Sequence, residues 1–125
     1  MIAGNCWMMC RPSSGPKAHL WLLVSNPQPD NKAVMVSITT LRHNADQTVI
    51  LQPGDHSFIR HPSCVFFADS LLIDIIDLAR WIDGGIAQPK SDFSQAILKV
   101  IQEGLLVSDF TPKKIVDFCR ACWNK

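Results

Sequence analysis

All four histidines lie in the first half of the chain, and two of them share one short polar segment. The segment Gly54–His61 (GDHSFIRH) contains His56 and His61, with Arg60 beside the second. Imidazoles titrate near neutral pH, so two of them can act as general acid and general base. A guanidinium can bind phosphate. Cleavage of RNA by its own 2′-hydroxyl needs these three roles and no cofactor, so the segment offers the groups for that reaction. Histidines this close also occur by chance, and then they stabilise a turn through hydrogen bonds.

Zinc binding is an alternative interpretation, because Zn²⁺ takes nitrogen and sulfur ligands. One candidate set combines three histidines with a cysteine: His19, His56, His61 and Cys64. A second set would join the two ends of the chain through four thiolates: Cys6, Cys10, Cys119 and Cys122. The first spacing matches no familiar zinc pattern. The last two cysteines lie on the apolar face of a predicted helix, which favours packing over metal binding. We therefore expect no metal and no cofactor.

Composition narrows the class of protein. The chain has 125 residues, about one domain, and its 47% hydrophobic and 18% charged residues exclude a mainly disordered chain. The net charge of +1 argues against a nucleic-acid binder that relies on bulk charge, but it allows a local basic patch. No apolar run approaches the ~20 residues of a membrane span, and no signal peptide is evident. With an odd number of cysteines, five, we predict a reduced, cytoplasmic protein.

Three zones divide the chain, which we expect to form a single domain over residues 1–125. Glycines and prolines predict an irregular lead-in over residues 1–18. Residues 19–76 are rich in β-branched and aromatic side chains, and residues 77–125 carry helical signals. Five short strands are expected in the middle zone: His19–Ser25, Ala33–Thr40, Gln47–Leu51, Ser63–Asp69 and Leu71–Ile76.

Helix signals complete the predicted fold. Asp77 is expected to cap a helix over Leu78–Asp83, and Ser91 to open a second helix that stops at Gly104. Thr111-Pro112 is typical of the start of a third helix. The fold class is therefore α+β: a small SH3-like β-barrel, or a strongly bent antiparallel sheet, followed by three C-terminal helices.

The order of these pieces resembles the MazF/PemK family of toxin endoribonucleases over about His19 to Gly85. HLWLLVSNP is similar to the family's apolar strand, VMVSITT to its strand ending in Ile-Thr, and FIRHPSCVFFADSLLIDIIDLARWIDGG to the remainder. The resemblance implies an SH3-like barrel, a possible homodimer and metal-independent cleavage of single-stranded RNA. It also implies a small antitoxin protein as partner. Phe66 and Ala68 stand where some members carry Arg and Asp, and the helices from Ser91 onward have no counterpart.

The resemblance and the histidine segment together define the predicted site. Thr39 matches the threonine of the Ile-Thr piece, and His19 stands close to the position of the family's arginine before the first matched strand. The catalytic residues are predicted to be His56, His61, Thr39 and His19, and the RNA phosphate ligands Arg60 and Arg42. Thr39 and Thr40 point in opposite directions on a strand, so only one can face a site. The alternative functions are a non-catalytic module that binds a protein or peptide, and a zinc-binding protein.

Overall fold

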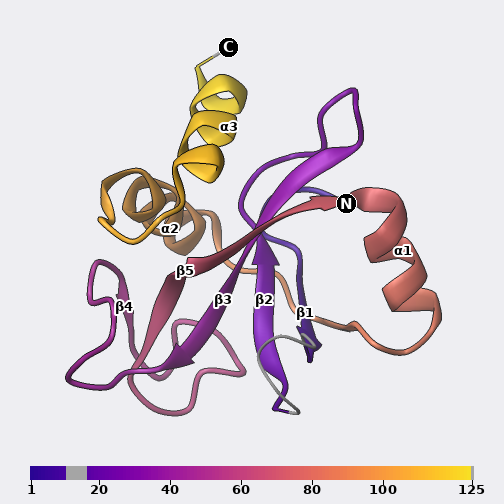
Figure 1. Ribbon diagram of the computed structural model, residues 1–125. Helices are drawn as coiled ribbons and strands as arrows, with labels where there is room; N and C mark the ends of the chain where they lie inside the picture. Colours follow the sequence, from indigo (N-terminus) through magenta and orange to yellow (C-terminus); the bar gives the residue numbers. More distant parts are fainter. Residues whose placement is uncertain (11–16, 125) are drawn as a thin grey trace.

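The computed structural model describes residues 1–10 and 17–124 (Figure 1). Its antiparallel sheet has the strand order β4-β5-β3-β2-β1-β6 and curls into a half-barrel, which confirms the α+β class and the bent sheet. The elements in chain order are β1 Cys6–Met9, β2 His19–Leu23, β3 Lys32–Thr40, β4 Ile50–Leu51, β5 Ser63–Asp74, α1 Ile75–Asp83, β6 Gln88–Lys90, α2 Gln95–Val107 and α3 Lys113–Trp123. No helix within the described ranges is long and apolar enough to cross a membrane.

Helices cover both faces of the sheet. Helices α2 and α3 lie on one side and α1 on the other (Figure 1). The core beneath α2 and α3 includes Leu22 and Val36 of the sheet and Ile101 of α2. The core beneath α1 includes Trp21 of β2 and Leu78 of α1. Because adjacent residues of a strand face opposite sides, this double cover explains why β2 and β3 are almost continuously apolar.

A bulge lets the long strand β5 contribute to both cores. The sequence predicts two strands here, but one strand runs over Ser63–Asp74. Between the pairs Met35–Leu71 and Ser37–Phe66, one residue of β3 lies opposite residues 67–70 of β5. Because β5 has more residues here than β3, its side chains switch to the other face of the sheet after the bulge. Phe67 therefore packs under α2 and α3, whereas Leu71 packs under α1. The Ser70 hydroxyl, which donates to the Phe67 carbonyl at 2.6 Å, stabilises the irregular segment.

Two strands were not predicted. The expectation of an irregular lead-in over residues 1–18 is wrong for Cys6–Met9, which forms strand β1 between β2 and β6. Residues 11–16 of that predicted lead-in lie outside the described residues. Strand β6 is a three-residue edge strand that pairs only with β1. Strand β4 is shorter than the predicted Gln47–Leu51, and it forms the opposite edge. Short strands at both edges limit pairing with other chains.

The predicted helix caps need correction at two places. Helix α1 is capped by Asp74 rather than Asp77, and the Asp74 carboxylate accepts from the Ile76 N–H at 2.8 Å. Helix α2 is capped by Ser94 rather than Ser91. In both cases a residue three positions from the predicted cap provides the side-chain oxygen that accepts a hydrogen bond from a backbone N–H of the first helical turn. Thr111-Pro112 directly precedes α3, as predicted.

Gly104 does not end α2, as the sequence suggested, but lies inside it. It is buried where α2 crosses the sheet, and a Cβ at this position would collide with Val49 and lie 3.2 Å from the Phe67 ring. The helix continues through glycine because the close approach leaves no room for a side chain.

We therefore expect Gly104→Ala to destabilise the protein by about 1–2 kcal/mol, although alanine favours helix by about 1 kcal/mol. Overpacking against Val49 and Phe67 outweighs that gain. Urea denaturation measures the effect, and Glu103→Ala on the exposed face of α2 serves as the matched control, expected within about 0.5 kcal/mol of wild type. Equal or higher stability of Gly104→Ala would contradict the close packing.

Candidate functional site

The ends of the central strands bring two of the predicted site residues together. Leu20 pairs with Ile38, so one step further the register sets His19 beside Thr39 on the neighbouring strand. The burial of β3 ends here, because Thr39 and Thr40 are only half-buried whereas Ala33–Ile38 are buried. Polar side chains can therefore reach solvent at this end of the sheet without leaving a buried group unpaired.

His19, Thr39 and His61 line one cavity of about 170 Å³, which we call the histidine cavity. The other lining residues relevant to chemistry are Lys17, Thr40 and Phe58. None of the described residues that line the cavity is acidic. A cavity with an ammonium, two imidazoles and hydroxyl groups favours an anion.

Thr40 rather than Thr39 contacts the exposed His61. The Thr40 hydroxyl lies 3.0 Å from Nε2 of His61 and can fix the orientation of the imidazole. Thr39, the threonine predicted for the site, also lines the cavity, and Thr40 was not among the predicted site residues. The alternation of β3 turns the two threonines toward opposite sides, yet both line this cavity, so the expectation that only one of them can face a site is wrong. The alternation does not tell toward which side the segment carrying His61 folds.

His56 lies apart from the histidine cavity and is buried. Its Nε2–H donates to the Ser91 carbonyl at 2.6 Å, and its Nδ1 accepts from the Phe58 N–H at 3.0 Å. The ring stacks on Phe93 with a centroid distance of 4.4 Å. With both nitrogens occupied inside the protein, His56 holds the segment that leads to His61 against the start of α2.

Two further contacts fix the same segment. The hydroxyls of Ser57 and Ser91 lie 3.0 Å apart. The Lys90 ammonium lies 4.7 Å from the centroid of the Phe58 ring, a cation–π contact. Phe58 also lines the histidine cavity, so these contacts position one of its walls and place a second ammonium near it.

The two predicted phosphate ligands lie in different places. Arg60 is exposed and is not among the residues that line the histidine cavity. Arg42 lines an adjoining cavity of about 310 Å³ together with Phe66 and Phe110, which we call the phenylalanine cavity. Thr39 and Thr40 line both cavities, so the two share a wall.

Asp46 connects the loops around the phenylalanine cavity, which it also lines. Its carboxylate accepts from the Ser108 hydroxyl at 2.6 Å, and from the backbone N–H and hydroxyl of Thr48 at 3.0 and 2.6 Å. Partial burial tends to raise the pKa of this carboxyl group. The hydrogen bonds from Ser108 and Thr48 outweigh it, and the pKa of Asp46 is lowered. The loop after β3 is thereby tied to the end of α2.

The cysteines do not support either zinc site. Within the described residues, no three or more His, Cys, Asp or Glu side chains are grouped to hold a metal ion. None of the five cysteines, all of which are described, forms a disulfide. Burial raises the pKa of Cys6 and Cys119 to about 12, and it also raises that of Cys64.

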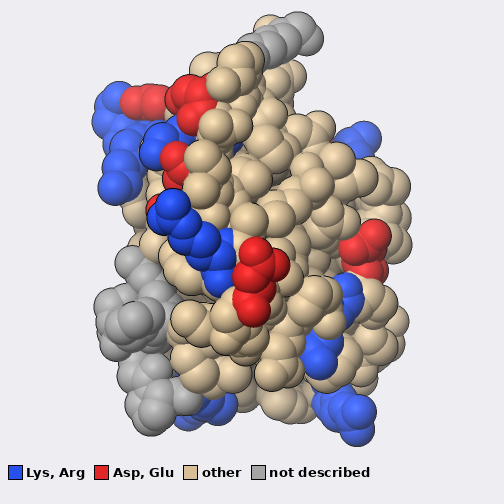
Figure 2. All heavy atoms as spheres, turned by 90° about the vertical axis from the view of Figure 1, so that its right-hand side faces the viewer, with Lys and Arg blue, Asp and Glu red and all other residues tan. Residues whose placement is uncertain are grey.

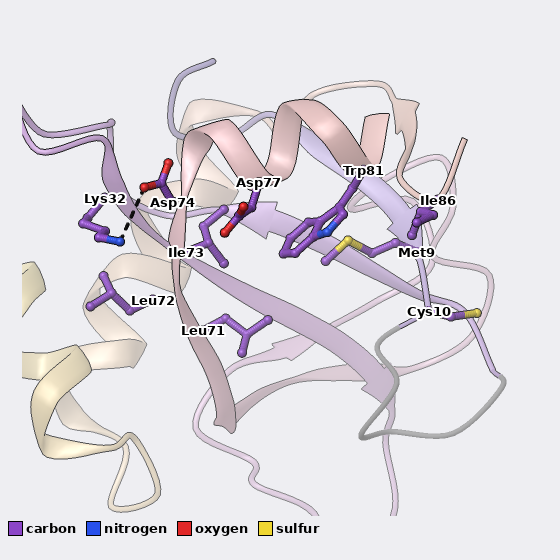
Figure 3. Close-up of a pocket in the computed structure, with 10 residues that line it drawn as sticks. All are labelled: Met9, Cys10, Lys32, Leu71, Leu72, Ile73, Asp74, Asp77, Trp81 and Ile86. Carbon is purple, nitrogen blue, oxygen red and sulfur yellow. Dashed lines mark ion pairs between the residues drawn. The ribbon is translucent and has the colours of Figure 1, made fainter. Parts of the chain in front are cut away.

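A larger cavity of about 470 Å³ lies beside α1 and was not predicted (Figure 3). Met9, Ile73 and Trp81 give it apolar walls, and an ion pair between Lys32 and Asp74 at 3.5 Å lies at one end. On the side of the molecule that carries α1, acidic and basic side chains lie close together amid wide uncharged areas (Figure 2). The described residues on this side therefore form no concentrated positive patch for a polyanion.

Comparisons with protein-family models, with curated proteins and with solved structures found no match to this chain. The functional interpretation therefore depends on the geometry of the cavities and on the sequence resemblance.

We expect His56→Ala to lower the free energy of unfolding by about 2–4 kcal/mol, because it removes a buried ring that stacks on Phe93 and the acceptor of the Phe58 N–H. Urea denaturation measures the loss. His43→Ala is the matched control, since His43 is exposed, and it should change stability by less than about 0.5 kcal/mol. A stable His56→Ala protein would show that the buried contacts of His56 do not hold the loop.

The lowered pKa of Asp46 predicts a pH dependence of stability. Its stabilising effect is present above the pKa of an unfolded aspartate, about 3.9, and is lost as the pH falls through the lower folded pKa. Asp46→Asn should therefore cost about 1 kcal/mol at pH 7, since solvent screens a carboxylate that is only partly buried. The difference from wild type should shrink below pH ~4. A difference that is constant from pH 7 to pH 3 in urea denaturation would contradict the assignment.

Proposed function

We propose that this protein is a metal-independent endoribonuclease that cleaves single-stranded RNA in the cytoplasm. The observation that carries the proposal is the convergence of His19, His61 and two threonines in a cavity whose described lining contains no carboxylate. The resemblance of His19 to Gly85 to the MazF/PemK toxins supports the same chemistry, and it adds an SH3-like barrel, a homodimer and a small antitoxin to the proposal.

The reaction needs an acid, a base and a positive charge. In the proposed mechanism one imidazole accepts the proton of the RNA 2′-hydroxyl, whose oxygen attacks the adjacent phosphorus. The bond from phosphorus to the 5′-oxygen breaks, and the other imidazole protonates that oxygen. The products are a 2′,3′-cyclic phosphate and a 5′-hydroxyl, so neither water nor an external cofactor is consumed. Lys17 stabilises the additional negative charge on the phosphorane.

The histidines divide into a catalytic and a supporting role in this proposal. His19 and His61 carry the proton transfers because both line the histidine cavity. Thr40 orients His61 through its hydroxyl, 3.0 Å from Nε2. His56 is a positioning residue, since its ring nitrogens bind Ser91 and Phe58 rather than facing the cavity.

A non-catalytic module that binds a protein or peptide is the second candidate. The cavity beside α1 favours it, because about 470 Å³ with apolar walls and an ion pair at one end suits an amphipathic segment. The two functions are compatible in one molecule, since this cavity and the histidine cavity share no lining residue.

Cleavage of a mixed-sequence RNA tests the proposed function. His61→Ala should slow cleavage by roughly 10²–10⁴-fold, because it removes one acid–base group. Thr40→Val keeps the shape of the side chain but removes the hydroxyl, and should slow cleavage about tenfold. Cleavage by the wild type should persist in a chelator of divalent metals.

The matched control is His43→Ala, which changes the same residue type at an exposed position outside the described cavities and should cleave at the wild-type rate. Melting temperatures of all variants separate catalytic from structural loss. No cleavage by the wild type, or full activity of a folded His61→Ala protein, would overturn the proposed mechanism.

A further inference from the structure

We propose that the phenylalanine cavity binds a nucleobase of the RNA whose phosphate enters the histidine cavity. This inference rests on the proposed function and adds a subsite to it. Thr39 and Thr40 line both cavities, so a base next to the reacting phosphate could reach the second cavity across the end of β3.

Two exposed aromatic side chains make this cavity suitable for a base. Phe66 on β5 and Phe110 after α2 both line it, with 44% and 62% of their surfaces exposed. Other large apolar side chains of this protein are also exposed, and what singles out these two is that both are aromatic and line the same cavity. The bases of single-stranded nucleic acids stack on aromatic rings of this kind, and every base has a flat face that can stack.

The charges assign different parts of the nucleotide to the two cavities. The described lining of the histidine cavity contains no carboxylate, whereas Asp46 lines the phenylalanine cavity. The Asp46 carboxylate offsets the charge of Arg42 in this cavity, so a phosphate is attracted there less than in the histidine cavity, whereas a neutral base is little affected. The larger cavity, about 310 Å³ against about 170 Å³, also suits the larger group.

Polar groups at the rim can contact the base and its backbone. Arg42 and Asn44 both line the cavity from the loop after β3. An asparagine amide can donate to and accept from a base edge, and a guanidinium can stack on a base or bind the neighbouring phosphate. The hydrogen bond between Ser108 and Asp46 holds this loop against the segment that carries Phe110, so the walls are fixed before a ligand binds.

Binding of uncleavable RNA tests the subsite. The probe is a fluorescent 2′-O-methyl oligonucleotide of mixed sequence, which lacks the 2′-hydroxyl needed for cleavage, and the comparison probe has the same backbone without bases. We expect Phe110→Ala and Phe66→Ala each to weaken binding of the first probe about tenfold. Phe110→Trp should retain affinity, and Phe110→Leu should not, because leucine keeps apolar surface but cannot stack. Val107→Ala, exposed on the same helix end, is the control.

The outcomes separate this inference from the proposed function. If Phe110→Ala raises KM for cleavable RNA and leaves kcat unchanged, whereas His61→Ala lowers kcat, both are supported. If both phenylalanine variants bind and cleave like the wild type, the base subsite is wrong and the endoribonuclease proposal stands. If the base-free probe loses affinity equally in Phe110→Ala, the ring does not act by stacking and the inference is overturned. A wild-type protein that binds neither probe overturns both proposals.

Discussion

Helices cover both faces of the sheet, and the central strands β2 and β3 must therefore be apolar on both sides. A free sheet face, the usual place for a polar site in an antiparallel sheet, does not remain on these strands. The bulge at residues 67–70 makes this arrangement possible, because it turns Phe67 and Leu71 of one strand toward opposite cores. Polar side chains that must contact a ligand are consequently confined to the strand ends and the connecting loops, where both candidate cavities lie.

The sequence predicts the central elements well, because β-branched and aromatic residues are dense in β2 and β3. It fails where a strand depends on its neighbour. Cys6–Met9 follows Gly4 and Asn5 without alternation, and only pairing with β2 and β6 makes it a strand. Strand β6 contains Pro89, which is tolerated only because the strand lies at an edge. Gly104 resembles a helix stop until Val49 and Phe67 are known to lie against it.

Residue types indicate the chemistry of the candidate site, but they do not say which residues meet. The prediction placed His19, Thr39 and His61 around one site, and the structure brings them to one cavity. The prediction also placed His56 at this site. Sequence spacing could not reveal that the backbone carbonyl of Ser91, far along the chain, accepts a hydrogen bond from the His56 ring. His56 and His61 belong to one segment, yet one is buried and the other exposed. Tertiary contacts, rather than local sequence, separate these two histidines.

The near-neutral net charge of +1 bears on how the proposed RNA substrate could be bound. Proteins that bind nucleic acid mainly through phosphate contacts need many lysines and arginines, and their affinity falls steeply with salt. Among the described residues, Lys17 lines the histidine cavity, and Lys90 contacts the Phe58 ring that forms one of its walls. If the proposed RNA substrate binds here, contacts other than those to phosphate would add to its affinity. Stacking on exposed rings needs no net charge, so the proposed base subsite beside the proposed catalytic cavity suits a nearly neutral protein better than a basic groove would.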